Sequence, residues 1–131
     1  MTRTIVLDSG ALIAVERNNT KVVSLLKASR ERNATVLIPA GAIAEAWRGG
    51  RQANLARLLN AAHDIPALDA EAAKRIGVAI ASCSGRGTAI DASVVDVALR
   101  NIPALILTSD PEDIGNLLGG EAENSVRVEV V

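Results

Sequence analysis

Aromatic side chains are almost absent from this sequence, which has one Trp and neither Phe nor Tyr. Proteins that grip single-stranded nucleic acid by base stacking need several aromatic side chains as a platform, so this mode of binding is excluded. Any nucleic acid bound by this chain must therefore be held mainly through its phosphate groups.

Cysteine and histidine are equally scarce, because Cys83 and His63 are the only residues of their kinds. One Cys and one His do not build a closed zinc site, and a lone Cys forms no internal disulfide. Other common catalytic patterns are missing too. Ser9 lies outside any nucleophile-elbow sequence, and neither a phosphate-binding P-loop nor a GxGxxG motif occurs.

Long hydrophobic runs are also missing, since apolar stretches such as 36–38 and 104–107 are far shorter than the roughly 20 residues of a membrane span. No secretory signal is recognisable after Met1. We therefore expect a cytoplasmic protein with no membrane partner. The 14 basic and 15 acidic residues give a net charge of -1, so no overall basic field favours nucleic acid.

The 131 residues, 49% of them hydrophobic and 22% charged, predict one globular domain spanning 1–131. Short aliphatic runs that read as strands alternate with helix-length amphipathic segments. Such alternation predicts an α/β fold with a mostly parallel sheet covered on both faces. The expected strands are 4–7, 35–38, 104–107 and 126–131, with a brief additional strand at 64–66.

Two helix starts are also predicted from local sequence. Thr20 is expected to cap the second helix, and Pro39 is expected to be the first residue of the third.

The segment 89–113 contains acids in unusually apolar surroundings. Asp91 and Asp96 lie within a helix-length apolar run, and Asp110 follows the strand-like run 104–107. Burying an ionised carboxylate is costly unless a positive charge compensates it. Arg100 is the only basic residue in this segment. The compensating charge must come from a distant Arg or from a bound cation, and we favour the cation.

Four acids are expected to meet at one edge of the sheet. Asp8 and Asp110 each follow a strand, and the functional crevice of a parallel sheet lies beyond the carboxyl ends of its strands. Glu45 lies on the helix after the second strand, and Asp91 begins a later helix. Carboxylates held this close raise each other's pKa unless a hard cation such as Mg²⁺ or Mn²⁺ binds them. Such an ion activates water for phosphodiester hydrolysis, so these four acids are the predicted catalytic set, with Asp8, Asp91 and Asp110 as metal ligands.

Four segments, LDSGALIAVER, PAGAIAEAWRGGRQANLARLL, IDASVVDVAL and LTSDPEDI, carry a resemblance to a known family. The chain resembles PIN-domain proteins, in particular the VapC-type toxins of bacterial toxin–antitoxin pairs. The resemblance implies a three-layer α/β/α sandwich and a Mg²⁺- or Mn²⁺-dependent endoribonuclease. It also implies a homodimer inhibited by a cognate VapB-like antitoxin. The matching acids are Asp8, Glu45, Asp91 and Asp110, with Asp113 as a lesser contributor.

Several of these residues have a second interpretation. Asp8, Asp91 and Asp110 are each placed to cap a helix, a role that is compatible with metal binding. Asp96 lies about 140° around the helix from Asp91, which directs it to the wall of the pocket or to a subunit contact. The remaining candidates are arginines that either contact RNA phosphates or are simply solvated, namely Arg48, Arg51 and Arg86.

Two other functions fit the same acids. The first is a non-catalytic PIN-fold binding module, whose acidic pocket captures an Arg of a partner protein. The second is a phosphohydrolase with Asp8 as nucleophile. That chemistry normally needs a second acid two residues later, where this chain has Gly10, so the second alternative is disfavoured.

Overall fold

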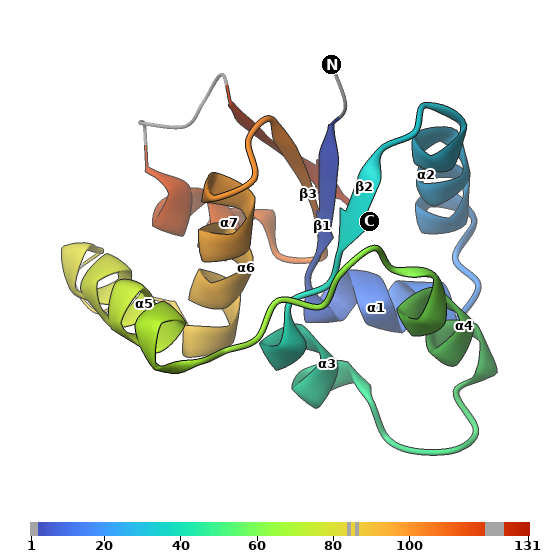
Figure 1. Ribbon diagram of the computed structural model, residues 1–131, viewed down its shortest axis with the longest axis horizontal. Coiled ribbons are helices and arrows are strands. Elements are labelled where there is room, and N and C mark those ends of the chain that lie inside the picture. Colours follow the sequence, from blue (N-terminus) through green and yellow to red (C-terminus); the bar gives the residue numbers. More distant parts are fainter. Residues whose placement is uncertain (1–2, 84, 86, 120–124) are drawn as a thin grey trace.

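Four parallel strands form one sheet in the order β2-β1-β3-β4 in the computed structural model of the chain (Figure 1). The structure describes residues 3–83, 85, 87–119 and 125–131. The strands are β1 (Thr4–Leu7), β2 (Thr35–Leu37), β3 (Ala104–Thr108) and β4 (Val126–Val130). The predicted parallel sheet is confirmed.

Helices cover both faces of the sheet. They are α1 (Ser9–Glu16), α2 (Thr20–Glu31), α3 (Ala40–Ala46), α4 (Ala53–Ala61), α5 (Ala70–Ser82), α6 (Ala89–Leu99) and α7 (Pro111–Leu118). On one side α6 packs against β1 and β3 and contacts α5 and α7, whereas α1 lies toward α2 and α4 (Figure 1). This arrangement is the expected three-layer α/β/α sandwich. No helix in the described part of the chain has the length and apolarity that crossing a bilayer demands.

The core explains why these segments form strands. Ile5, Val6 and Leu7 of β1 are all buried, as are Ile106 and Leu107 of β3. A strand buried on both faces reads as a continuous aliphatic run rather than as an alternating one. These apolar strands fix the sheet, and the polar residues that follow them are thereby held at its edge.

Three local predictions are wrong, namely the cap of α2, the first residue of α3 and the short strand at 64–66. Asn19, not Thr20, caps α2, because its side chain accepts a hydrogen bond of 3.2 Å from the Val22 N–H. Pro39 is the cap residue before α3 rather than its first helical residue.

The brief strand expected at 64–66 is reduced to a single bridge between Leu37 and Asp64. There the His63 ring nitrogen Nδ1 accepts from the Val36 N–H at 2.9 Å. A side chain thus takes an acceptor position that a neighbouring strand's carbonyl would fill, so regular pairing stops.

The carboxyl ends of β1 and β3 meet at one edge of the sheet. The Asp8 N–H donates to the Leu107 carbonyl at 3.1 Å, which ties the first residue after β1 to β3. Gly10 follows directly, and a Cβ built on it would lie 2.6 Å from the Ser109 Cβ. The start of α1 therefore approaches the end of β3 so closely that only glycine fits without movement.

Candidate metal centre

Three carboxylates converge where α6 and α7 begin. One oxygen from each of Asp91, Asp110 and Asp113 lies within 4.8 Å of the others. Asp91 lies in the first turn of α6, Asp110 caps α7, and Asp113 lies in the first turn of α7. Among the described residues, no Lys or Arg forms a salt bridge with any of the three. We call Asp91, Asp110 and Asp113 the aspartate cluster.

Helix capping holds the cluster in place. The Asp110 side chain accepts from the Asp113 N–H at 3.4 Å, so this residue combines the capping role with membership of the cluster. Asp91 does not cap α6. Its own N–H donates to the Thr88 hydroxyl at 3.0 Å, so Thr88 is the cap, and the Asp91 carboxylate is a member of the cluster.

Asp8 lies behind the cluster and is only 3% exposed. Its Oδ1 accepts from the Ala11 N–H at 2.8 Å, so it caps α1, while its Oδ2 accepts from the Thr108 hydroxyl. Both carboxylate oxygens therefore have protein donors. A buried carboxylate with both oxygens engaged is poorly placed to attack a phosphate, which weighs against Asp8 as a nucleophile.

Thr108 connects Asp8 to the cluster. Besides donating to Asp8, its hydroxyl accepts from the Asp110 N–H at 2.8 Å. Thr108 is fully buried and ends an otherwise aliphatic strand. No sequence motif identifies Thr108 as a site residue. Its one signal is a hydroxyl at the last position of a buried apolar run.

Burial and, to a smaller extent, repulsion between the acids raise the pKa values of Asp8 and Asp91. Burial raises the pKa of Asp8 most, and repulsion from Asp91 adds to this, while hydrogen bonds from Thr108 and Ala11 act in the opposite direction. Burial also raises the pKa of Asp91 most, a hydrogen bond with the Thr88 side chain acts in the opposite direction, and repulsion from Asp110 and Glu45 adds to the increase.

A hydrogen bond shared with the Asp110 side chain, followed by repulsion from the same group, raises the pKa of Asp113. Repulsion from a neighbouring acid contributes to all three shifts, so the acids at this edge of the sheet are close enough to affect one another's charge.

Only two of the three predicted metal ligands belong to the aspartate cluster. Asp91 and Asp110 are in both sets, but the third member of the aspartate cluster is Asp113 and not Asp8. Glu45 is exposed on α3 and is close enough to Asp91 to raise its pKa, without belonging to the cluster. Sequence spacing alone does not separate the acid that is buried behind the site from the acids that face into it.

Asp96 has a different partner. Arg75 of α5 donates from Nε and Nη2 to the two carboxylate oxygens of Asp96, at 2.9 and 3.1 Å. The charge of Asp96 is thus compensated by an arginine far away in the sequence, and this ion pair joins α5 to α6.

The arginines predicted to contact RNA differ in their surroundings. The Arg48 guanidinium donates to the carbonyls of Ala44 and Trp47, at 3.3 and 2.8 Å, at the end of α3. Arg51 is exposed. Arg86 lies outside the described residues.

The aspartate cluster fits a hard divalent cation. Carboxylate oxygens are the donors that Mg²⁺ and Mn²⁺ prefer. Burial raises the pKa of Asp91 most and a hydrogen bond with Asp110 raises that of Asp113 most, and a bound cation would offset the repulsion that adds to both shifts. In comparisons with known proteins, no family model and no curated protein sequence matches this chain.

Proposed function

We propose that this chain is a Mg²⁺- or Mn²⁺-dependent endoribonuclease of the PIN-domain type, acting as the toxin of a toxin–antitoxin pair. The nuclease proposal rests on the convergence of three carboxylates. Among the residues that the structure describes, no Lys or Arg forms a salt bridge with any of them. The proposal is supported by their position at the carboxyl edge of a parallel sheet, where α/β proteins bind their ligands.

Each acid has a distinct task in this proposal. Asp91, Asp110 and Asp113 would hold the ion, which supplies an activated water and neutralises charge on the phosphate. Glu45, exposed and close to Asp91, is the candidate acceptor for the proton of that water. Asp8 and Thr108 are positioning residues, because their hydrogen bonds connect the start of α1 to the Asp110 backbone.

RNA as the substrate, the VapB-like antitoxin and the homodimer rest on the family resemblance of the four sequence segments. The composition supports a phosphate-directed contact, since one Trp is the only aromatic residue.

RNA cleavage by the Asp110→Asn variant tests the nuclease proposal. Asn keeps the shape of the cap but removes one charge, so we expect the rate with Mn²⁺ to fall at least about 100-fold. Asp64→Asn is the matched control, because Asp64 is also an exposed acid at the sheet, where it forms a single bridge with Leu37, but it lies outside the cluster. Cleavage that persists in excess chelator would contradict the proposal.

A second candidate function is the non-catalytic module that captures a partner's Arg. The observation in its favour is that Asp8 already has protein donors on both oxygens, so the cluster open to a ligand is small. A guanidinium would also neutralise the aspartate cluster. The two functions differ in Mn²⁺ uptake, which the binding module should lack.

A further inference from the structure

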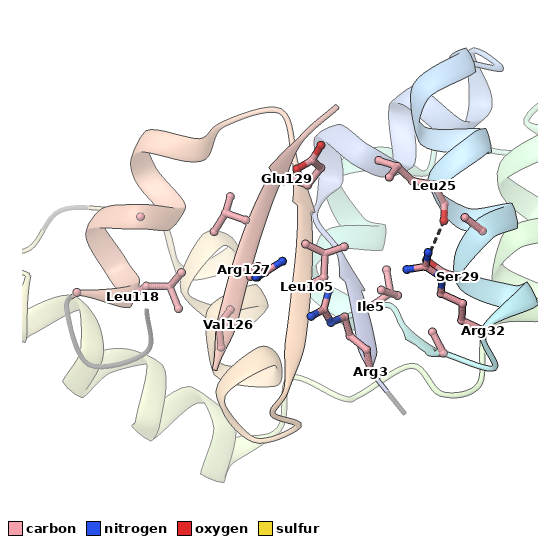
Figure 2. Close-up of a pocket in the computed structure, with 15 residues that line it drawn as sticks. Arg3, Ile5, Leu25, Ser29, Arg32, Leu105, Leu118, Val126, Arg127 and Glu129 are labelled. Carbon is pink, nitrogen blue, oxygen red and sulfur yellow. Dashed lines mark hydrogen bonds between the residues drawn. The ribbon is translucent and has the colours of Figure 1, made fainter. Parts of the chain in front are cut away.

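A groove of about 850 Å³ runs over one face of the sheet, from the amino-terminal ends of the strands to Glu129 of β4. Arg3, Ala34 and Val126, at the amino-terminal ends of three strands, help to line it, whereas the cluster follows the carboxyl ends. Its floor includes Ile5 of β1 and Leu105 of β3 (Figure 2). None of the three clustered aspartates lines the groove, so it is a site separate from the candidate metal centre.

Three arginines enter this groove from three different elements. Arg3 precedes β1, Arg32 ends α2, and Arg127 lies on β4. Figure 2 shows the side chains of Arg3 and Arg127 extending toward Leu105, whereas the side chain of Arg32 lies on the α2 side of the groove, near Ser29. Strand register explains part of this, because Arg127 pairs with Leu105, which pairs with Ile5. We call the site the arginine groove.

The charges in the arginine groove are not balanced by the described residues. Its acid, Glu129, lies 3.5 Å from the Lys21 amine and is paired with it. No described acid forms a salt bridge with Arg3, Arg32 or Arg127. Three guanidinium groups thus face one hollow in a chain whose net charge is -1. Arginine recognises phosphate and carboxylate groups through paired hydrogen bonds, so an anionic ligand is expected.

The size of the groove and its apolar floor limit the class of ligand that fits it. Its volume of about 850 Å³ lies in the range of pockets that hold whole organic molecules rather than a single small anion. Ile5, Leu25 and Leu105 provide an apolar surface between the arginines. A ligand with repeated anionic groups and less polar parts between them matches this arrangement, as a nucleic-acid strand does.

We propose that the arginine groove binds the phosphate backbone of single-stranded RNA, as a contact separate from the carboxylates. The choice of RNA over an acidic peptide rests on the proposed function. No aromatic residue lines the groove among the described residues, so the contact is made to phosphates and is independent of base sequence.

Fluorescence anisotropy with a labelled single-stranded RNA, in chelator to prevent cleavage, tests the proposal. The test variant is Arg32→Gln with Arg127→Gln. The control is Arg30→Gln with Arg57→Gln, since these arginines line a different hollow between α2 and α4 and removing them changes the net charge equally. We expect the test variant to bind about tenfold more weakly or worse, and its slope of log affinity against log salt to be shallower by about 1.4.

Equal affinity and salt slope in the test variant and the control would overturn the proposal. Displacement of the RNA by polyglutamate at equal charge concentration would also overturn it, in favour of an acidic protein partner. Cleavage measured separately with Mn²⁺ distinguishes the two proposals. If the chain binds RNA through the groove but does not cut it, only the proposed nuclease activity is contradicted. If the chain cuts RNA and its binding does not depend on Arg32 and Arg127, only the groove proposal is contradicted.

Discussion

At the scale of single residues, the Thr108 hydroxyl joins two acids of the site through its hydrogen bonds. It donates to the buried Asp8 carboxylate and accepts from the Asp110 N–H. Replacing it with valine keeps the shape but leaves both partners without this bond. A buried polar group left unsatisfied costs about 1–3 kcal/mol. We therefore expect Thr108→Val to lower the free energy of unfolding by about that amount and to reduce cleavage.

Denaturant unfolding measures the Thr108 prediction. Thr35→Val is the control, because Thr35 is a half-buried strand threonine with no side-chain hydrogen bond among the described residues. A Thr108→Val protein that is as stable as this control would show that the hydroxyl does not hold the edge together.

The raised pKa of Asp91 has a consequence for stability. Because the folded protein holds this proton more tightly than the unfolded chain, the folded state binds more protons between the ordinary pKa of 3.8 and the raised folded pKa. Stability of the metal-free protein therefore falls as pH rises through this window. Asp91→Asn removes the charge, so we expect this variant to be more stable than the natural chain at pH 7 without metal.

Urea unfolding between about pH 4 and 8 in chelator measures this effect. The natural chain should lose stability toward neutral pH, and the Asp91→Asn variant should lose less of it. A variant that is less stable than the natural chain at pH 7 would mean that the Asp91 charge is compensated in the folded protein.

At the scale of elements, the close approach of α1 to β3 positions Asp8 beside the cluster. A Cβ on Gly10 would lie 1.8 Å from the Ser109 Oγ and 2.6 Å from its Cβ. Gly10→Ala should therefore force the two elements apart and destabilise the protein by about 1–3 kcal/mol. Adding Ser109→Gly removes both contacts and should restore most of this loss.

Gly77 on α5 provides the control, since a Cβ there meets nothing within 4 Å. Alanine is a better helix former than glycine, so Gly77→Ala should stabilise the protein by up to about 1 kcal/mol. If Gly10→Ala were equally harmless, the approach of α1 to β3 would be looser than the structure has it.

One ion pair and one helix cap show why contacts that depend on the packing of helices cannot be predicted from sequence. The apolar run around Asp96 indicates that its charge needs a partner, but it does not reveal Arg75, which is 21 residues away and reaches it only after α5 packs on α6. Similarly, Asn19 and Thr20 are both good caps by residue type. Only the backbone conformation at Asn19 decides between them.

At the scale of the whole molecule, the fold follows from the sequence because strands buried on both faces alternate with amphipathic helices. The order of these segments predicts the parallel sheet, and the sheet predicts that Asp8 and Asp110 share an edge. The exact ligand set does not follow. Whether Asp8 or Asp113 faces the cluster depends on side-chain burial and hydrogen bonds with Thr108, which are created only by the assembled sheet.

The arginine groove is also a property of the assembled molecule. Arg3, Arg32 and Arg127 are far apart in the sequence, and they meet because β4 lies beside β3 and because α2 and β1 both contribute to the lining of the same hollow. The net charge of -1 does not reveal such a site, because it sums these arginines with acids elsewhere in the chain.

Titration calorimetry with Mn²⁺ tests the central claim most directly, because all the proposed chemistry requires an ion at the aspartate cluster. The full chain should take up Mn²⁺ saturably, and Asp91→Asn, Asp110→Asn and Asp113→Asn should each weaken that uptake while Asp64→Asn leaves it unchanged. At about 100 times the dissociation constant, the ion should also stabilise the fold by about 2.7 kcal/mol. No uptake by the natural chain, or equal uptake by all four variants, would contradict the account.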